Sequence, residues 1–286
     1  MARQGRPRRL LTYGLHTVET VDRPADDAAL RRRTASLGED GALLAGGTWL
    51  FSVPQPHLRG LVDLTAPSWP ALTVTGSGLT VAATATFAEV VGAGSLPEWT
   101  AVPLIRGCAE ALVGSHKIWN VATVGGNIAL ALPAAPMITL AATLDGVAVV
   151  WPAMGGEIRM PVVDLVVGAH RTTLRRGDVL RALELPARAL RSRTALRTVS
   201  LSPLGRSAVL LGGRVDADGA VAIAVTAARE RPVVLRFPTS PTVRELDDAV
   251  CGLDVGGPWY DDPHGSPQWR RAMTRRLAQE IRDELR

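Results

Sequence analysis

Cysteine is scarce in this chain, which contains only Cys108 and Cys251. Two isolated cysteines form no metal-ligand spacing and imply no disulfide framework. A conventional iron–sulfur cluster generally needs four ligands, mostly cysteines, so the chain cannot hold one alone. The histidines show no metal-ligand spacing, and neither GxSxG nor HExxH occurs. We therefore assign no metal site and no catalytic residue from the sequence.

Long apolar runs are also missing. No stretch approaches the roughly 20 residues that span a bilayer, and the basic start MARQGRPRRL leads into no apolar segment of the secretory type. We therefore expect a cytoplasmic protein with no membrane partner. The basic residues are nearly all arginine, with Lys117 the only lysine. Neither aromatic interleaving nor a known binding motif accompanies them, so we expect no nucleic-acid partner.

Hydrophobic periodicity divides the rest of the chain into successive units. A strand around Thr17–Val21 and a helix from Ala25 to about Leu37, followed by the strand ALLAGG, are typical of a βαβ unit. Strands then alternate with a helix near 100–113. A small antiparallel sheet and helices follow, the last an amphipathic helix over Arg270–Leu285. The predicted parts are a basic extension at 1–15, a βαβ unit at 16–66, a second unit at 67–186 and a C-terminal unit at 187–286.

Two glycine motifs, LLAGGTWLF at 43–51 and ATVGGNIALALPAAP at 122–136, follow or interrupt apolar runs. Consecutive glycines permit tight turns and bring main-chain N–H groups close to the phosphate or carbonyl oxygens of a ligand. Thr48 after the first pair and Asn127 after the second indicate one extended, diphosphate-bearing cofactor held from two sides. Each pair is equally consistent with an ordinary hairpin turn. Neither motif has Walker or Rossmann spacing, which disfavours a P-loop nucleotidase or an ordinary NAD domain.

Together with their surroundings, these motifs resemble the FAD-binding medium subunit of the molybdenum hydroxylases, the family of carbon monoxide dehydrogenase and xanthine dehydrogenase. The resemblance continues through TVETVDRPADDAALRRR, LVDLT, LTVAATATFAEVV, LDGVAVV, TTLRRGDVLRALELP and DDPHGSPQWRRAMTRRL. It implies an α+β fold with a two-part FAD-binding domain of the vanillyl-alcohol-oxidase/PCMH type. A small α+β C-terminal domain of the CO dehydrogenase flavoprotein type, with an antiparallel sheet, would follow. FAD is the implied cofactor. The implied partners are an iron–sulfur small subunit, a molybdopterin large subunit and a small-molecule electron acceptor.

The resemblance also assigns the cofactor-binding residues. The N–H groups of residues 45–48 would surround the FAD pyrophosphate, and the Thr48 hydroxyl would add a donor. The second motif would bind the pyrophosphate and ribityl region, with Gly126 in a turn that needs a positive φ. Trp49 would contact the ring or serve only in packing. The assigned residues are Leu43, Ala45, Gly46, Gly47, Thr48, Trp49, Val113, Gly114, Thr123, Gly125, Gly126, Asn127, Leu180 and Arg197.

Several positions depart from the family pattern. Leu130 and Leu132 stand where polar residues are expected, Pro136 replaces an aspartate, and Arg206 replaces an acidic residue. Two functions therefore stay open. The chain could be the FAD subunit of a molybdenum hydroxylase, passing electrons from iron–sulfur centres of a partner to an external acceptor. It could instead be a repurposed flavin oxidoreductase acting alone on a small metabolite, or a scaffold that has lost FAD; the departures favour this alternative somewhat.

Overall fold

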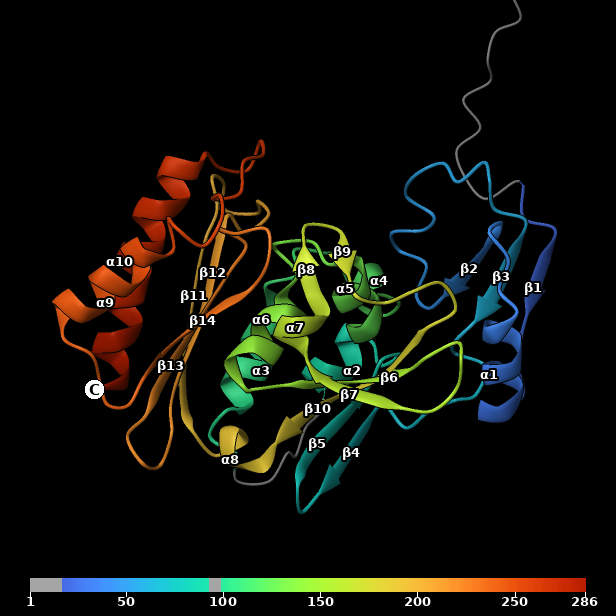
Figure 1. Ribbon diagram of the computed structural model, residues 1–286, viewed down its shortest axis with the longest axis horizontal. Helices are drawn as coiled ribbons and strands as arrows, with labels where there is room; N and C mark the ends of the chain where they lie inside the picture. Colours follow the sequence, from blue (N-terminus) through green and yellow to red (C-terminus); the bar gives the residue numbers. More distant parts are fainter. Residues whose placement is uncertain (1–16, 93–98) are drawn as a thin grey trace, which may run out of the picture.

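The computed structural model describes residues 17–92 and 99–286, which fold into a mixture of helices and four separate sheets (Figure 1). The predicted N-terminal extension at 1–15 lies outside the described residues. Within the described part of the chain, no helix is both long and apolar enough to cross a membrane.

The first unit is a three-stranded parallel sheet with one helix. Its strands β1 (Thr20–Asp22), β3 (Gly60–Asp63) and β2 (Gly41–Leu44) lie in that order. Helix α1 (Asp27–Ala35) begins after Asp26, whose carboxylate accepts a hydrogen bond from the Ala29 N–H at 2.7 Å. This capping contact pairs a free N–H of the first turn. The βαβ arrangement agrees with the prediction, although the helix is shorter at both ends than its apolar pattern indicated.

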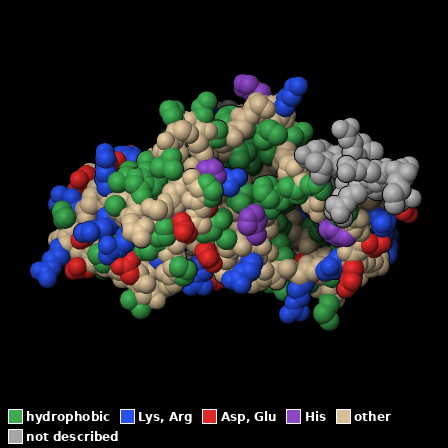
Figure 2. Space-filling view, turned by 90° about the horizontal axis from the view of Figure 1, so that it is seen from above, with side chains coloured by type: hydrophobic (Ala, Val, Ile, Leu, Met, Phe, Trp, Pro, Cys, Tyr) green, Lys and Arg blue, Asp and Glu red, His purple; other side chains and the backbone are tan. Residues whose placement is uncertain are grey.

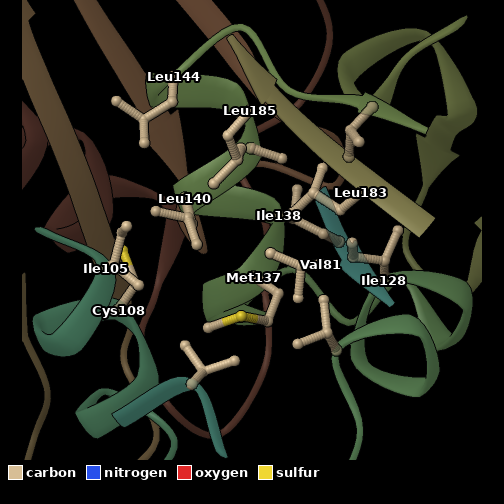
Figure 3. Close-up of a cluster of buried hydrophobic side chains, with 14 of the residues drawn as sticks. Val81, Ile105, Cys108, Ile128, Met137, Ile138, Leu140, Leu144, Leu183 and Leu185 are labelled. Carbon is tan, nitrogen blue, oxygen red and sulfur yellow. The ribbon is translucent and has the colours of Figure 1, made fainter. Parts of the chain in front are cut away.

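The second unit is built on a five-stranded antiparallel sheet in the order β4-β5-β10-β6-β7. Helix α6 packs between this sheet and the next one, and all eight of its residues are buried. A helix that is apolar all round belongs in a protein interior. Figure 3 shows Met137 and Leu140 of this helix, and Leu144 directly after it, among side chains of α3, β5 and β10. The elements are β4 (Leu72–Thr75), β5 (Gly78–Ala82), α2 (Phe87–Gly92), α3 (Val102–Glu110), α4 (His116–Trp119), α5 (Val124–Leu130), α6 (Pro136–Thr143), β6 (Val147–Trp151), β7 (Ile158–Pro161), α7 (Val162–Leu165), β8 (Val166–Gly168), β9 (Arg171–Thr172), β10 (Val179–Pro186) and α8 (Ala187–Leu190).

The third unit is a four-stranded antiparallel sheet covered on both faces. Its strands are β11 (Arg193–Val199), β12 (Val209–Val215), β13 (Val221–Thr226) and β14 (Val233–Phe237), in that order. Helices α9 (Val243–Gly252) and α10 (Pro267–Leu285) lie on the outer face in Figure 1, and α6 contacts the inner face. Every residue of β13 is buried, because neither face meets solvent.

Two neighbouring glycines of β12 let helices approach from opposite sides. A Cβ on Gly212 would lie 2.0 Å from the Thr143 hydroxyl of α6, and one on Gly213 would lie 2.2 Å from a methyl of Ile281 on α10. Side chains at these two positions would push the helices away from the sheet. The GG pair in this strand is therefore required for packing.

An arginine network joins α6 to the C-terminal sheet. Arg214 of β12 is 1% exposed and donates hydrogen bonds to the Thr143 carbonyl at 2.7 Å and to Asp145 at 2.5 Å. Asp145 also accepts from Arg188 and Arg236. Burial alone would raise the pKa of Asp145, but the hydrogen bonds from these three arginines outweigh it and hold the pKa well below its ordinary value. The buried arginine charge is thus compensated.

Candidate functional site

A cavity of about 650 Å³ lies where the three units meet. The first unit contributes residues 43–50, the second contributes α5 and the segments beside it, and the third contributes Leu204, Arg206, Ser207 and His264. Most of the lining is apolar. Figure 2 shows hydrophobic side chains gathered around the hollow on this face of the molecule. A cavity of this size suits a cofactor-sized ligand.

The first glycine motif presents four amide groups that the fold leaves unused. No described residue accepts a hydrogen bond from the N–H groups of Ala45, Gly46, Gly47 or Thr48. All four residues line the cavity. Successive unpaired N–H groups in a turn form a concave anion site, and hydrogen bonds to a charged acceptor are stronger than neutral ones. This wall can therefore bind a diphosphate without a lysine.

Each glycine of the first motif has its own steric reason. A Cβ on Gly46 would lie 1.6 Å from the Val121 carbonyl oxygen, so the two glycine motifs touch through their backbones. Gly47 has a φ of +68°, and a Cβ there would lie 2.4 Å from the Phe51 ring. A larger residue at either position would displace the loop.

The second glycine motif is the start of helix α5, and the predicted turn with a positive φ at Gly126 is wrong. Thr123 is the N-cap, and its hydroxyl accepts from the Gly126 N–H at 3.1 Å. The N–H groups of Val124 and Gly125 donate to the Ala85 and Ala83 carbonyls. Since these amides are already bonded within the protein, they have no free donors for a phosphate.

The residues of the second motif nevertheless line the cavity. Thr123, Gly125, Gly126 and Asn127 all do so, and the glycines bring the helix backbone close to the space. A Cβ on Gly125 would lie 2.4 Å from that of Ala83, which fixes α5 against β5. The side-chain amide oxygen (Oδ1) of Asn127 accepts from the Met137 N–H at 3.0 Å, so this side chain also holds the start of α6.

The remaining assigned residues divide into two groups. Leu43, Trp49, Val113 and Leu180 line the cavity. Gly114 and Arg197 are not among its lining residues. Arg197 on β11 instead pairs with Glu280 at 3.2 Å and Glu284 at 2.5 Å on α10, so its charge is used within the C-terminal unit.

The departures from the family pattern fall in different places. Leu130 and Leu132 line the cavity and make that wall apolar. Pro136 is buried at the first turn of α6 and is not a lining residue. Arg206 does line the cavity.

The C-terminal wall was not predicted from the sequence. Leu204, Arg206, Ser207 and His264 come from two loops far apart in the chain. Arg270 of α10 holds both loops together, since its buried guanidinium donates to the carbonyls of Ala208 and Gly265. The sequence of neither loop indicates that it lines the cavity. The only local sign was the basic residue Arg206 at a position where the family pattern has an acidic one.

The titratable groups of the cavity are few. Asp178 is engaged by the loop around it, accepting from the Ala153 N–H at 2.9 Å and the Arg175 N–H at 2.8 Å. The backbone N–H of His264 donates to the Asp262 carboxylate. Within residues 17–92 and 99–286, no cluster of His, Cys, Asp or Glu could hold a metal ion. The unpaired amides at 45–48 and the apolar walls suit the binding of an extended molecule that is partly anionic and partly apolar.

Comparisons with known proteins agree with this geometry. A family model described as the FAD binding domain in molybdopterin dehydrogenase matches residues 20–188. The cyanide-inactivated Cu,Mo-CO dehydrogenase superposes with a TM-score of 0.81 and 21% identity over 94% of this chain and 97% of that one. Reconstituted CO dehydrogenase from Oligotropha carboxidovorans gives 0.82 and 20% over 94% and 97%, respectively. Quinoline 2-oxidoreductase from Pseudomonas putida 86 gives 0.77 and 21% over 96% and 98%. No curated protein sequence matches the chain.

The structural likeness confirms the predicted α+β fold, and the residues present fit FAD. The four free amides at 45–48 match the needs of a diphosphate, and the apolar walls match those of a planar ring. The family model covers more than half of the chain. The protein therefore belongs to the family of FAD-binding domains of molybdopterin dehydrogenases, whose cofactor is FAD.

Proposed function

We propose that this chain is the FAD subunit of a multi-subunit molybdenum hydroxylase. In that role it receives electrons from iron–sulfur centres of a partner subunit and delivers them to a small-molecule acceptor. The observation that carries the proposal is the intact anion-binding turn at 45–48, placed on an apolar cavity in a member of this family.

The side chains of the cavity suit electron transfer better than proton chemistry. Bound FAD would supply a centre that accepts and releases electrons. The chain itself would bind the diphosphate through the four amides and Thr48, and exclude water with Leu130, Leu132 and Leu180. Asp178, the one carboxylate among the described residues that line the cavity, already accepts two main-chain hydrogen bonds. A role as general base would require breaking that turn.

The cysteines support partners for the remaining centres. Cys108 is buried in the core of the second unit and Cys251 lies on α9, so they cannot ligate one cluster. Similar structures are those of CO dehydrogenase and quinoline 2-oxidoreductase. We therefore propose an iron–sulfur subunit and a molybdopterin subunit as partners.

Two further expectations from the sequence are kept as proposals. The assembly has a cytoplasmic location, and the domains of this chain divide near residues 66 and 186.

Purification tests the proposal in two steps. The chain alone should show flavin absorbance, release FAD rather than FMN in mass spectrometry, and contain no iron. Isolated from its native host, it should copurify with an iron–sulfur chain and a molybdopterin chain. A colourless chain that takes up no FAD would favour the scaffold alternative. A flavin-loaded single chain that oxidises a small metabolite without partners would favour the stand-alone enzyme.

A further inference from the structure

Arg206 supplies the only arginine or lysine side chain among the described residues that line the cavity. It lies in the segment between β11 and β12, directly after Leu204 and Gly205. Arg206, Ser207, Leu132 and Ala134 also line a small neighbouring cavity of about 10 Å³. Arg206 therefore belongs to the same wall as Leu132.

The charge of Arg206 is not neutralised by the fold. No described residue accepts a hydrogen bond from its guanidinium or forms an ion pair with it, whereas the buried Arg214 and Arg270 are each paired with aspartate. Arginine stays protonated throughout the physiological range. Arg206 is exposed to solvent, so a permanent positive charge lies at the surface beside a cavity with mostly apolar walls.

The first glycine motif and the Arg206 wall suit different parts of FAD. The four amides at 45–48 already meet the needs of the diphosphate. Leu132, which lines both cavities together with Arg206, suits the apolar ring. With the diphosphate on the amides at 45–48, Arg206 would be a cation on the ring side of the site.

We propose that Arg206 is a positioning residue that raises the reduction potential of bound FAD. Two-electron reduction with uptake of one proton from solvent leaves one negative charge on the ring. A cation stabilises this charge by Coulomb attraction, which falls gradually with distance and needs no direct contact. The inference rests on the proposed binding of FAD in this cavity. Arg206 stands where the family pattern has an acidic residue, so the charge at this position is reversed.

Redox titration of four proteins tests the proposal. Wild type, Arg206→Gln, Arg206→Lys and the control Arg244→Gln are loaded with FAD and reduced by dithionite against a reference dye. Arg244 is 92% exposed on α9, so its replacement changes the net charge equally without touching the cavity. FAD content and far-ultraviolet circular dichroism are measured first. Arg206→Met replaces Arg206→Gln if the latter does not fold.

We expect Arg206→Gln to lower the equilibrium constant for reduction about tenfold, equivalent to about 30 mV for a two-electron couple. Arg206→Lys and Arg244→Gln should stay within twofold of wild type. FAD-loaded Arg206→Gln with an unchanged potential would overturn the inference alone. An equal fall in Arg244→Gln would also overturn it, because net charge would then explain the effect. A wild-type chain that binds no FAD would overturn both the inference and the proposed function.

Discussion

Gly46 and Val121 lie in backbone contact: a Cβ on Gly46 would be 1.6 Å from the Val121 carbonyl oxygen. The contact joins the free amides of the first motif to the segment that leads into α5. Cofactor affinity therefore depends on a junction between two parts of the chain that are remote in sequence.

Gly46→Ala should weaken FAD binding at least tenfold, because the added methyl separates the two motifs and moves the four amides. Overpacking of this kind typically costs about 1–3 kcal/mol. Fluorescence titration of the apoprotein with FAD measures the change in Kd. Gly76→Ala is the matched control, since a Cβ there would meet nothing within 4 Å. Equal FAD affinity in Gly46→Ala and wild type would mean that the contact does not position the binding turn.

Thr48→Val should weaken FAD binding by about 10- to 100-fold while leaving riboflavin binding unchanged. The substitution keeps the shape and removes a hydroxyl whose hydrogen bond to a charged group is worth about 1.5–3 kcal/mol. Riboflavin lacks phosphate and is the internal control. If both ligands lose affinity equally, Thr48 does not contact the diphosphate.

Asp145→Asn should lower the free energy of unfolding by about 3 kcal/mol, the low end for breaking a buried ion pair, because Arg214 keeps Asp216 as a partner. Urea denaturation at neutral pH measures the loss. Asp248→Asn is the control, since Asp248 is 72% exposed and lies 3.8 Å from Arg244. A loss below about 0.5 kcal/mol in Asp145→Asn, the range of ordinary surface substitutions, would contradict the structural role of the network.

The stabilisation from Asp145 should depend on pH in acid. Its pKa is lowered in the folded state, so the unfolded chain binds the proton more readily. The contribution is complete above about pH 5 and falls as the pH drops toward the folded-state pKa. The difference in unfolding free energy between wild type and Asp145→Asn should therefore shrink between pH 5 and pH 3, as measured by urea denaturation. A constant difference across that range would be inconsistent with the lowered pKa.

The sequence predicted those features that depend on local patterns. Helix α10 and strands β12 to β14 follow from periodicity and runs of β-branched residues, and the free amides of the first motif follow from its paired glycines. The second motif was predicted as a turn, although Thr123 three residues before Gly126 is a helix N-cap signal. Glycine pairs favour turns in general, and here the close approach of α5 to Ala83 explains them instead.

The distant contacts could not be predicted. Arg197 was assigned to the cofactor because its position in the chain resembled that of a family residue, but its two glutamate partners lie on the last helix. The wall with Leu204, Arg206 and His264 depends on Arg270, which bonds to both loops. Such pairings depend on tertiary packing, which a single sequence does not encode in any local signal.

Helix α6 joins the part of the chain that the family model matches to the C-terminal sheet. The family match ends at residue 188, yet α6 lies entirely inside and touches β12 and β13 beyond that point. A fragment ending there would expose the Thr139 and Thr143 face of the helix, together with the unpaired buried side of the Asp145 network. The packed unit around α6 is therefore larger than the part of the chain that the family model matches, so an exchange of segments with a relative should keep both parts together.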